Sequence, residues 1–173
     1  NVTPGLGEMP EVWVLVSALQ GAEVAAQVGV PMSLAYFINQ DCLEFAKYYR
    51  DNFVPSVFSN EPRISVGIFS ICAETDTEAE ELALSASMWR QNSQRGLFAP
   101  FPTLDEAKGS IKLNNTDDKE NRTFVGSPET VQEKLQPLLE EVQPEELKII
   151  TICEPFVARK KSYDLIKNIF NAN

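Results

Sequence analysis

The sequence predicts an α/β fold in which parallel strands alternate with helices. Short apolar runs, rich in β-branched and aromatic residues, recur along the chain and are too short to be buried helices. Segments with helical spacing follow these runs, and turn residues separate the two kinds of segment. This alternation is typical of parallel strands joined by right-handed crossovers. The 173 residues suit a single domain with a sizeable core.

The first predicted unit is a strand, a turn, a helix and a second strand. The strands cover 12–16 and 32–37, and the helix over 21–28 has a small apolar face. The turn over 17–21 lies between the carboxyl end of the first strand and the amino end of the helix. Because backbone N–H groups and the positive end of a helix dipole meet at such a turn, it suits a phosphate.

The rest of the chain continues this alternation. Two further strands are predicted over 64–72 and 147–153, and the first of them is apolar enough to be covered on both faces. Segment 96–121 is the least regular part of the chain. Segment 123–126 is short and extended and is not counted as a strand, so four strands are predicted in all. Further helices are predicted over 42–53, 77–95, 104–108, 128–142 and 155–170.

Capping residues support three of these helices. Asp41, Thr75 or Asp76, and Ser127 each stand directly before a predicted helix, where a side-chain oxygen can accept a first-turn N–H bond. Glu74 and Asp76 also have the residue types of an acid–base pair. Their position before a helix favours capping and dipole complementation instead.

Composition narrows the possible functions. The net charge of −10 argues against nucleic acid or an anionic membrane surface as the main partner, and no apolar run approaches the roughly 20 residues that cross a bilayer. The absence of histidine removes Ser-His-Asp catalysis and most zinc sites, so no catalytic residue and no metal ligand is assigned. No signal peptide is evident, and the three cysteines are expected to be reduced, buried thiols in a cytoplasmic protein.

Three segments in a fixed order carry a family resemblance. Segment 12–39 reads VWVLVSALQGAEVAAQVGVPMSLAYFIN, in which AAQVGVP closely matches a helix ending A-A-x-x-G-L-P. Segments 71–90 (ICAETDTEAEELALSASMWR) and 124–135 (FVGSPETVQEKL) follow it. Together they resemble the bacterial-luciferase-like flavin monooxygenases over essentially the whole chain.

The resemblance implies that residues 1–173 form a single domain, the C-terminal half of a TIM (β/α)8 barrel with strands five to eight. Members of the family are about twice as long, as a complete barrel requires. Their catalytic residues, including a histidine, lie mainly in the other half, which fits the absence of histidine here. The isolated chain is therefore expected to be inactive.

The resemblance also implies a cofactor. We expect from the resemblance that reduced FMN binds at the carboxyl end of the complete barrel and reacts with O2, and that a small organic substrate is oxidised. Ser17, Ala18 and Gly21 align with the turn that holds the FMN phosphate. Val16 and Ala18 stand where the family has a glycine and a second serine. The alternative is an ordinary turn with Ser17 as the helix cap.

Tyr36, Phe37 and Asn39 end the next predicted strand and would face the barrel mouth near the flavin. Core packing of the two aromatic residues, with Asn39 in a turn, is the alternative. Trp13 and Trp89 are expected to pack in the fold, and Ser127 to cap its helix.

A half-length chain leaves several interpretations open. It is a proteolytic fragment, the product of a truncated or split gene, or one part of a larger assembly. A half-barrel has open strand edges, here near 12–17 and 147–153, and open edges recruit another chain. We therefore expect a homo-oligomer or pairing with an N-terminal barrel half. The alternative functions are a catalytically inactive barrel half with a structural or interaction role, and a flavodoxin-like carrier, which needs a fifth strand.

Overall fold

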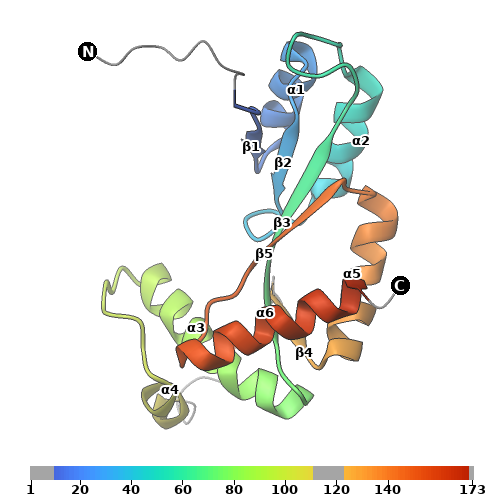
Figure 1. The fold of residues 1–173 in the computed structure, drawn as a ribbon. Helices are drawn as coiled ribbons and strands as arrows, with labels where there is room; N and C mark the ends of the chain where they lie inside the picture. Colours follow the sequence, from blue (N-terminus) through green and yellow to red (C-terminus); the bar gives the residue numbers. More distant parts are fainter. Residues whose placement is uncertain (1–9, 111–122, 172–173) are drawn as a thin grey trace, which may run out of the picture.

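The computed structural model describes residues 10–110 and 123–171. Figure 1 shows how the elements are arranged. Residues 111–121 of the irregular segment 96–121 lie outside the described residues. In chain order the elements are β1 (Val14–Val16), α1 (Leu19–Val28), β2 (Met32–Ala35), α2 (Cys42–Asn52), β3 (Ile64–Cys72), α3 (Asp76–Gln94), α4 (Leu104–Ser110), β4 (Thr123–Gly126), α5 (Pro128–Val142), β5 (Glu146–Ile150) and α6 (Phe156–Asn171).

The strands form one parallel sheet, which confirms the predicted α/β class. Strands β1, β2, β3 and β4 are paired in that order, and β5 pairs with β3. β5 runs beside the first part of β3, from Ser65 to Phe69, whereas β4 pairs with its carboxyl end, from Phe69 to Cys72. The expected count of four strands is therefore wrong, because 123–126 joins the sheet as a fifth. Its pairing partner lies more than fifty residues earlier, so no local pattern reveals it.

The side chains of β3 alternate between two faces of the sheet, as the period of a strand requires. Ile64, Val66 and Ile68 are fully buried in the larger core cluster, which also contains side chains of α1, α2, α5 and α6. Ile71 belongs instead to a second cluster with Ala79, Leu82 and Ala86 of α3. The predicted two-sided burial of this strand is thus confirmed at its carboxyl end, where helices lie on both faces.

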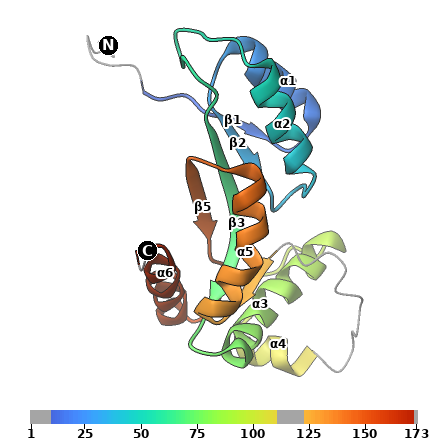
Figure 2. The same ribbon diagram turned by 90° about the vertical axis from the view of Figure 1, so that its right-hand side faces the viewer.

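The face of the sheet that α3 partly covers is otherwise open. Figure 2 shows α1 and α2 on one side of β1 and β2, and within the described residues no helix lies on their other side. Leu15, which points to this side, is 64% exposed. We call this surface the open face. Its residues are Leu15, Ser33, Ser65, Phe69, Lys148 and Ile150, which alternate with core residues along their strands. Leu15, Lys148 and Ile150 are exposed, whereas Ser33 and Ser65 are buried.

Four helices, α1, α2, α3 and α5, test the predicted N-terminal caps, and two of them have the predicted side-chain capping bond. The Thr75 side chain accepts the Glu78 N–H, and the Ser127 side chain accepts the Thr130 N–H, so both predicted caps are confirmed. Asp41 precedes α2 but makes no side-chain capping bond. The N-cap of α1 is Ala18, so the interpretation of Ser17 as its cap is wrong.

Packing explains the cysteines and one of the two tryptophans. All three cysteines are buried and free, as expected, and burial raises the pKa of Cys42 and Cys72 to about 11. Trp13 lies beneath two cations: the Arg63 guanidinium is 5.1 Å and the Lys148 Nζ is 4.6 Å from its ring centroid.

No helix in the described parts of the chain is long and apolar enough to span a bilayer.

Candidate functional site

The turn after β1 and the loop after β2 meet at the carboxyl edge of the sheet. The Asn39 side-chain amide donates a 3.2 Å hydrogen bond to the Ser17 main-chain carbonyl. The same Asn39 side chain accepts the Asp41 N–H at 3.0 Å through its Oδ1 atom. Residues that the sequence assigns to one site, Ser17 and Asn39, are therefore brought together across two strands.

The amino end of α1 is electrostatically suited to an anion. Its N-cap, Ala18, is extended and provides no side-chain hydrogen bond to the first turn, and that turn carries no acidic residue. The Gly21 N–H donates to the Ala18 carbonyl at 3.0 Å. The partial positive charge at this helix end is thus not offset by a carboxylate of its own first turn.

Gly21 allows α1 to lie close to β1. A Cβ atom at Gly21 would stand 3.3 Å from both γ-methyl groups of Val16, which is tighter than ordinary van der Waals contact. Val16 is only 1% exposed and points into the larger core. The valine that stands where the resemblance expects a glycine therefore fills space beneath the turn, and its side chain is part of the larger core.

The two aromatic residues after β2 point in different directions. Tyr36 packs against the larger core, with its ring stacked 5.7 Å from that of Phe124, as in the packing alternative. The pKa of Tyr36 is raised mainly by burial and, to a smaller extent, by the charge of Cys42. The Phe37 ring instead lies 4.8 Å from that of Phe69 and over Gly67, on the open face. Contact between Tyr36 and a cofactor stays a prediction.

A second hydrogen-bonded cluster joins α3 and α5 at the carboxyl end of β3. The Asp76 carboxylate accepts the Ser127 backbone N–H at 2.7 Å, and Ser127 in turn caps α5. The Ser127 N–H, followed by the Thr130 hydroxyl, holds the pKa of Asp76 below its usual range. Both residues are therefore engaged in structure: Ser127 caps α5 as predicted, whereas Asp76 lies in the first turn of α3, which Thr75 caps, and bonds across to Ser127. Within the described residues, no group of three potential ligands is placed to hold a metal ion.

Comparison with known proteins tests the predicted resemblance. No known protein-family profile matches the chain. The chain is 34% identical over 175 residues to the uncharacterized protein YceB of Bacillus subtilis (strain 168), covering 98% of the chain and 53% of that protein. It is 30% identical over 171 residues to the luciferase-like monooxygenase of Escherichia coli (strain K12), covering 96% of the chain and 51% of that protein. The chain spans about half the length of the curated relatives it matches.

Solved structures agree with the sequence relatives. The crystal structure of apo-MsnO8 superposes with a TM-score of 0.91 at 28% identity, over 99% of this chain and 54% of that one. The resemblance to luciferase-like monooxygenases is confirmed. The oxygenating constituent of 3,6-diketocamphane monooxygenase from Pseudomonas putida, in complex with FMN, shares the fold with a TM-score of 0.62. Its identity is 18%, over 91% of this chain and 47% of that chain.

The chain therefore corresponds to about half of the fold of these structural neighbours. Its relatives and structural neighbours support a flavin-dependent monooxygenase as the class to which it is related. The predicted turn residues Ser17, Ala18 and Gly21 lie together at the carboxyl edge, and Asn39 lies beside them. The sequence alone did not place Phe69 beside Ile150 on the open face, because only strand pairing brings these two residues together.

Proposed function

We propose that the chain is part of a flavin-dependent monooxygenase that uses reduced FMN and O2 to oxidise a small organic substrate. The similarity to a luciferase-like monooxygenase of Escherichia coli is the observation that carries this reaction class. Because the chain spans about half of that protein, complete activity is proposed only for an assembly that includes the other half.

We propose that the turn after β1 holds the phosphate of FMN. Ser17 offers a hydroxyl, Ala18 lets the backbone approach the ligand closely, and Gly21 lies in the first turn of α1. The fit rests on the uncapped, carboxylate-free start of α1 and on the bond by which Asn39 holds the Ser17 carbonyl. FMN, when bound, supplies the redox chemistry with O2, while these residues bind and orient it. Tyr36 would support the site by fixing the end of β2 through its packing on Phe124.

We also propose that the chain pairs through its strand edges with an N-terminal barrel half or with a second copy of itself. Within the described residues, β1 pairs only with β2, and β5 pairs only with β3, so each has one unpaired edge. Unpaired edges present rows of free N–H and C=O groups that recruit further strands. A sedimentation experiment at micromolar concentration tests this, and a monodisperse monomer would contradict self-association.

Flavin binding to the full chain tests the phosphate site. The informative variant is Ala18→Asp, because aspartate is a good N-cap and should stabilise α1 while its charge repels a phosphate. We expect FMN affinity to fall about tenfold or more, as a loss of ~1.4 kcal/mol implies. Riboflavin, which lacks the phosphate, is the matched control ligand, and its affinity should not change.

An equal loss of FMN and riboflavin binding in Ala18→Asp would contradict the phosphate assignment. A colourless preparation that also fails to bind added FMN would favour the second candidate function, a catalytically inactive barrel half with a structural or interaction role. The replacement of the family's second serine by Ala18 is the observation that favours this candidate.

A further inference from the structure

Each end of the sheet has a free strand edge, and the two edge strands run in the same direction. Within the described residues, β1 pairs only with β2, β5 pairs only with β3, and all of these pairings are parallel. Figures 1 and 2 show α1 and α6, the helices that follow the two edge strands, at opposite ends of the molecule. The β5 edge of one molecule can therefore pair in parallel with the β1 edge of another.

The helix at the β1 end has exposed valines on the side away from its neighbouring helix. The Ala26 carbonyl of α1 accepts the Val54 N–H, 2.9 Å away, from the segment that follows α2. Val24 and Val28 are each two residues from Ala26, which places them about 160° from it around the helix. Both valines are exposed. The side of α1 that is turned away from α2 is therefore apolar and uncovered in the described part of the chain.

The helix at the β5 end has a stripe of exposed aromatic side chains. Phe156, Tyr163 and Phe170 follow one another at intervals of seven residues, so they lie on one side of α6, and all three are exposed. We call these three residues the aromatic stripe. The Tyr163 hydroxyl accepts the Thr151 N–H at 3.0 Å, which places the stripe beside the carboxyl end of β5. Each end of the sheet thus presents a strand edge together with an apolar helix surface.

The two helices differ in charge. α6 contains four cations and one acid: Arg159, Lys160, Lys161, Lys167 and Asp164. α1 contains no cation, and its one acid is Glu23. Contact between two α6 helices would bring like charges together, whereas α1 and α6 are opposite in sign. The charges therefore favour contact of α1 in one molecule with α6 in another.

We propose that two copies of this chain associate through these surfaces, with β1 and α1 of each copy against β5 and α6 of the other. The inference rests on the pairing proposed for the strand edges and deepens it by selecting a second copy as the partner. Strands β1, β2, β3 and β5 lie side by side, so two copies supply eight parallel strands, four from each. A parallel barrel closes at eight strands, with side chains filling its interior. The contact is heterologous, and closure limits the assembly to a dimer.

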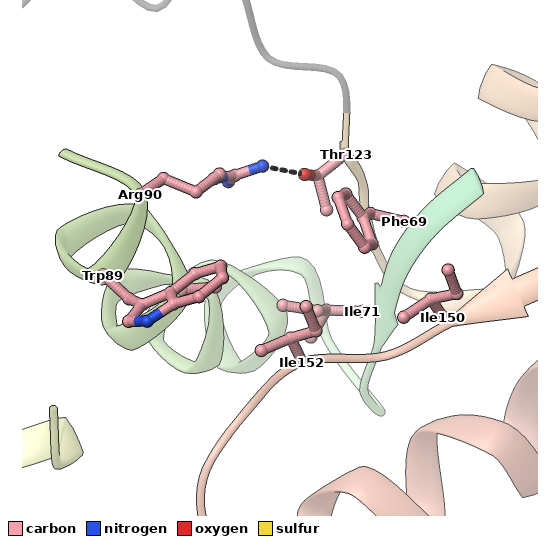
Figure 3. A pocket seen from close by; sticks show the side chains of 8 residues that line it. Phe69, Ile71, Trp89, Arg90, Thr123, Ile150 and Ile152 are labelled. Atoms are coloured by element: carbon pink, nitrogen blue, oxygen red, sulfur yellow. Dashed lines mark hydrogen bonds between the residues drawn. The ribbon is translucent and has the colours of Figure 1, made fainter. Parts of the chain in front are cut away.

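The open face can become the interior of this dimer without burying an unpaired charge. The Lys148 Nζ donates a 2.9 Å hydrogen bond to the Ser65 hydroxyl and lies 3.2 Å from the Glu146 carboxylate. Figure 3 shows Trp89 of α3 on the same side of the sheet as Ile150, and both side chains are exposed. Association would remove apolar side chains of this face from water, which favours the dimer.

Sedimentation equilibrium of the natural chain and of two variants tests the proposal. We expect the natural chain to be a dimer at micromolar concentration. Val24→Lys places a cation where α1 meets the cations of α6, and Phe170→Glu interrupts the aromatic stripe with a charge. Each substitution alters both contacts of the dimer, so each should raise the dissociation constant about tenfold or more. The matched control is Phe98→Lys, because Phe98 is 93% exposed in the segment after α3, outside both surfaces, and should leave the constant within about twofold.

An equimolar mixture of Val24→Lys and Phe170→Glu tests whether the contact is heterologous. In a mixed dimer one contact combines both substitutions and the other contains neither, so the mixture should associate more tightly than either variant alone. Circular dichroism of each variant checks that it is folded. A monomeric natural chain, assemblies that grow beyond two copies, an equal effect of Phe98→Lys, or no gain on mixing would each overturn the inference.

Flavin binding separates this inference from the proposed reaction class. A monomeric natural chain that binds FMN would overturn the dimer and leave the proposed flavin function standing. A dimer that binds neither FMN nor riboflavin would overturn the flavin function and leave the dimer standing.

Discussion

The side-chain amide of Asn39 donates a hydrogen bond to the main-chain carbonyl of Ser17, over a distance of 3.2 Å and a separation of 22 residues. The bond joins the loop after β2 to the turn after β1, so the position of the candidate phosphate turn depends on a neighbouring strand. A backbone group held by a second loop is less free to move when a ligand binds, which lowers the entropy cost of binding.

Replacing Asn39 by alanine should weaken FMN binding. The substitution removes the bond to the Ser17 carbonyl and the bond from the Asp41 N–H, and each costs ~1 kcal/mol, so affinity is expected to fall about fivefold or more without loss of the fold. The control is Asn52→Ala, because Asn52 makes only a local, exposed bond to the Tyr48 carbonyl, 2.9 Å long. Calorimetric titration of both variants with FMN gives the comparison, and equal affinities would argue against a role for Asn39 at the turn.

Local signals in the sequence were sufficient for much of the fold. Thr75 and Ser127 cap their helices because the capping partner lies three residues away in each case. Non-local contacts could not be read in this way. The Asp76 carboxylate meets Ser127 across 51 residues, and β4 pairs with β3 only after the chain has turned back through α3. The opposite directions of Tyr36 and Phe37 likewise depend on which helices cover each face of the sheet.

Asp76 should make stability depend on pH at the acid end. Its pKa is lowered from the ordinary value of 3.8, first by the Ser127 backbone N–H and then by the Thr130 side chain. A lowered pKa in the folded state means that the ionised carboxylate stabilises the fold above the ordinary value, and that this contribution is lost as pH falls through the lower, folded value.

Asp76→Asn should therefore unfold at a lower urea concentration than the natural chain at neutral pH. The difference should shrink as the pH falls below 3.8 and through the lower pKa that Asp76 has in the folded state, because both chains then carry an uncharged side chain at this position. Asp164→Asn, at an exposed position within α6, is the control for the loss of one acid. A difference between Asp76→Asn and the natural chain that stays constant over this range would show that ionisation of Asp76 does not contribute.

Two glycines in left-handed conformation should respond very differently to alanine. Gly29 ends α1 with φ 71°, and a Cβ atom there would stand 2.1 Å from the Val54 carbonyl oxygen. Gly96 has φ 74°, and a Cβ atom there would have no heavy atom within 4 Å. Gly96→Ala pays only the backbone strain of about 1–2 kcal/mol. Gly29→Ala adds a steric clash and should lower the free energy of unfolding by roughly 3 kcal/mol or more. Urea denaturation of the two variants separates the backbone strain from the steric clash. Similar losses of unfolding free energy in both variants would contradict the close approach of Val54 to Gly29.

The hydroxyl group of Tyr49 should be a main polar contribution to core stability. Tyr49 is fully buried, donates a 2.9 Å hydrogen bond to the Val30 carbonyl and accepts one of 3.2 Å from the Arg63 N–H. It thereby joins the segment before β2 to the segment before β3. Tyr49→Phe keeps the ring and its 5.3 Å edge contact with Phe53 but removes both bonds.

Because polar groups left unpaired in the interior cost about 1–3 kcal/mol, Tyr49→Phe should lower the free energy of unfolding by that amount. The neighbouring Tyr48, which is half-buried on the same helix, provides the matched control Tyr48→Phe. Tyr48→Phe removes a more accessible hydroxyl group and should change the free energy of unfolding by about 0.5 kcal/mol or less. If both variants unfold at the same urea concentration, the Tyr49 hydroxyl does not hold β2 and β3 in register, and the stability of this corner comes from apolar packing alone.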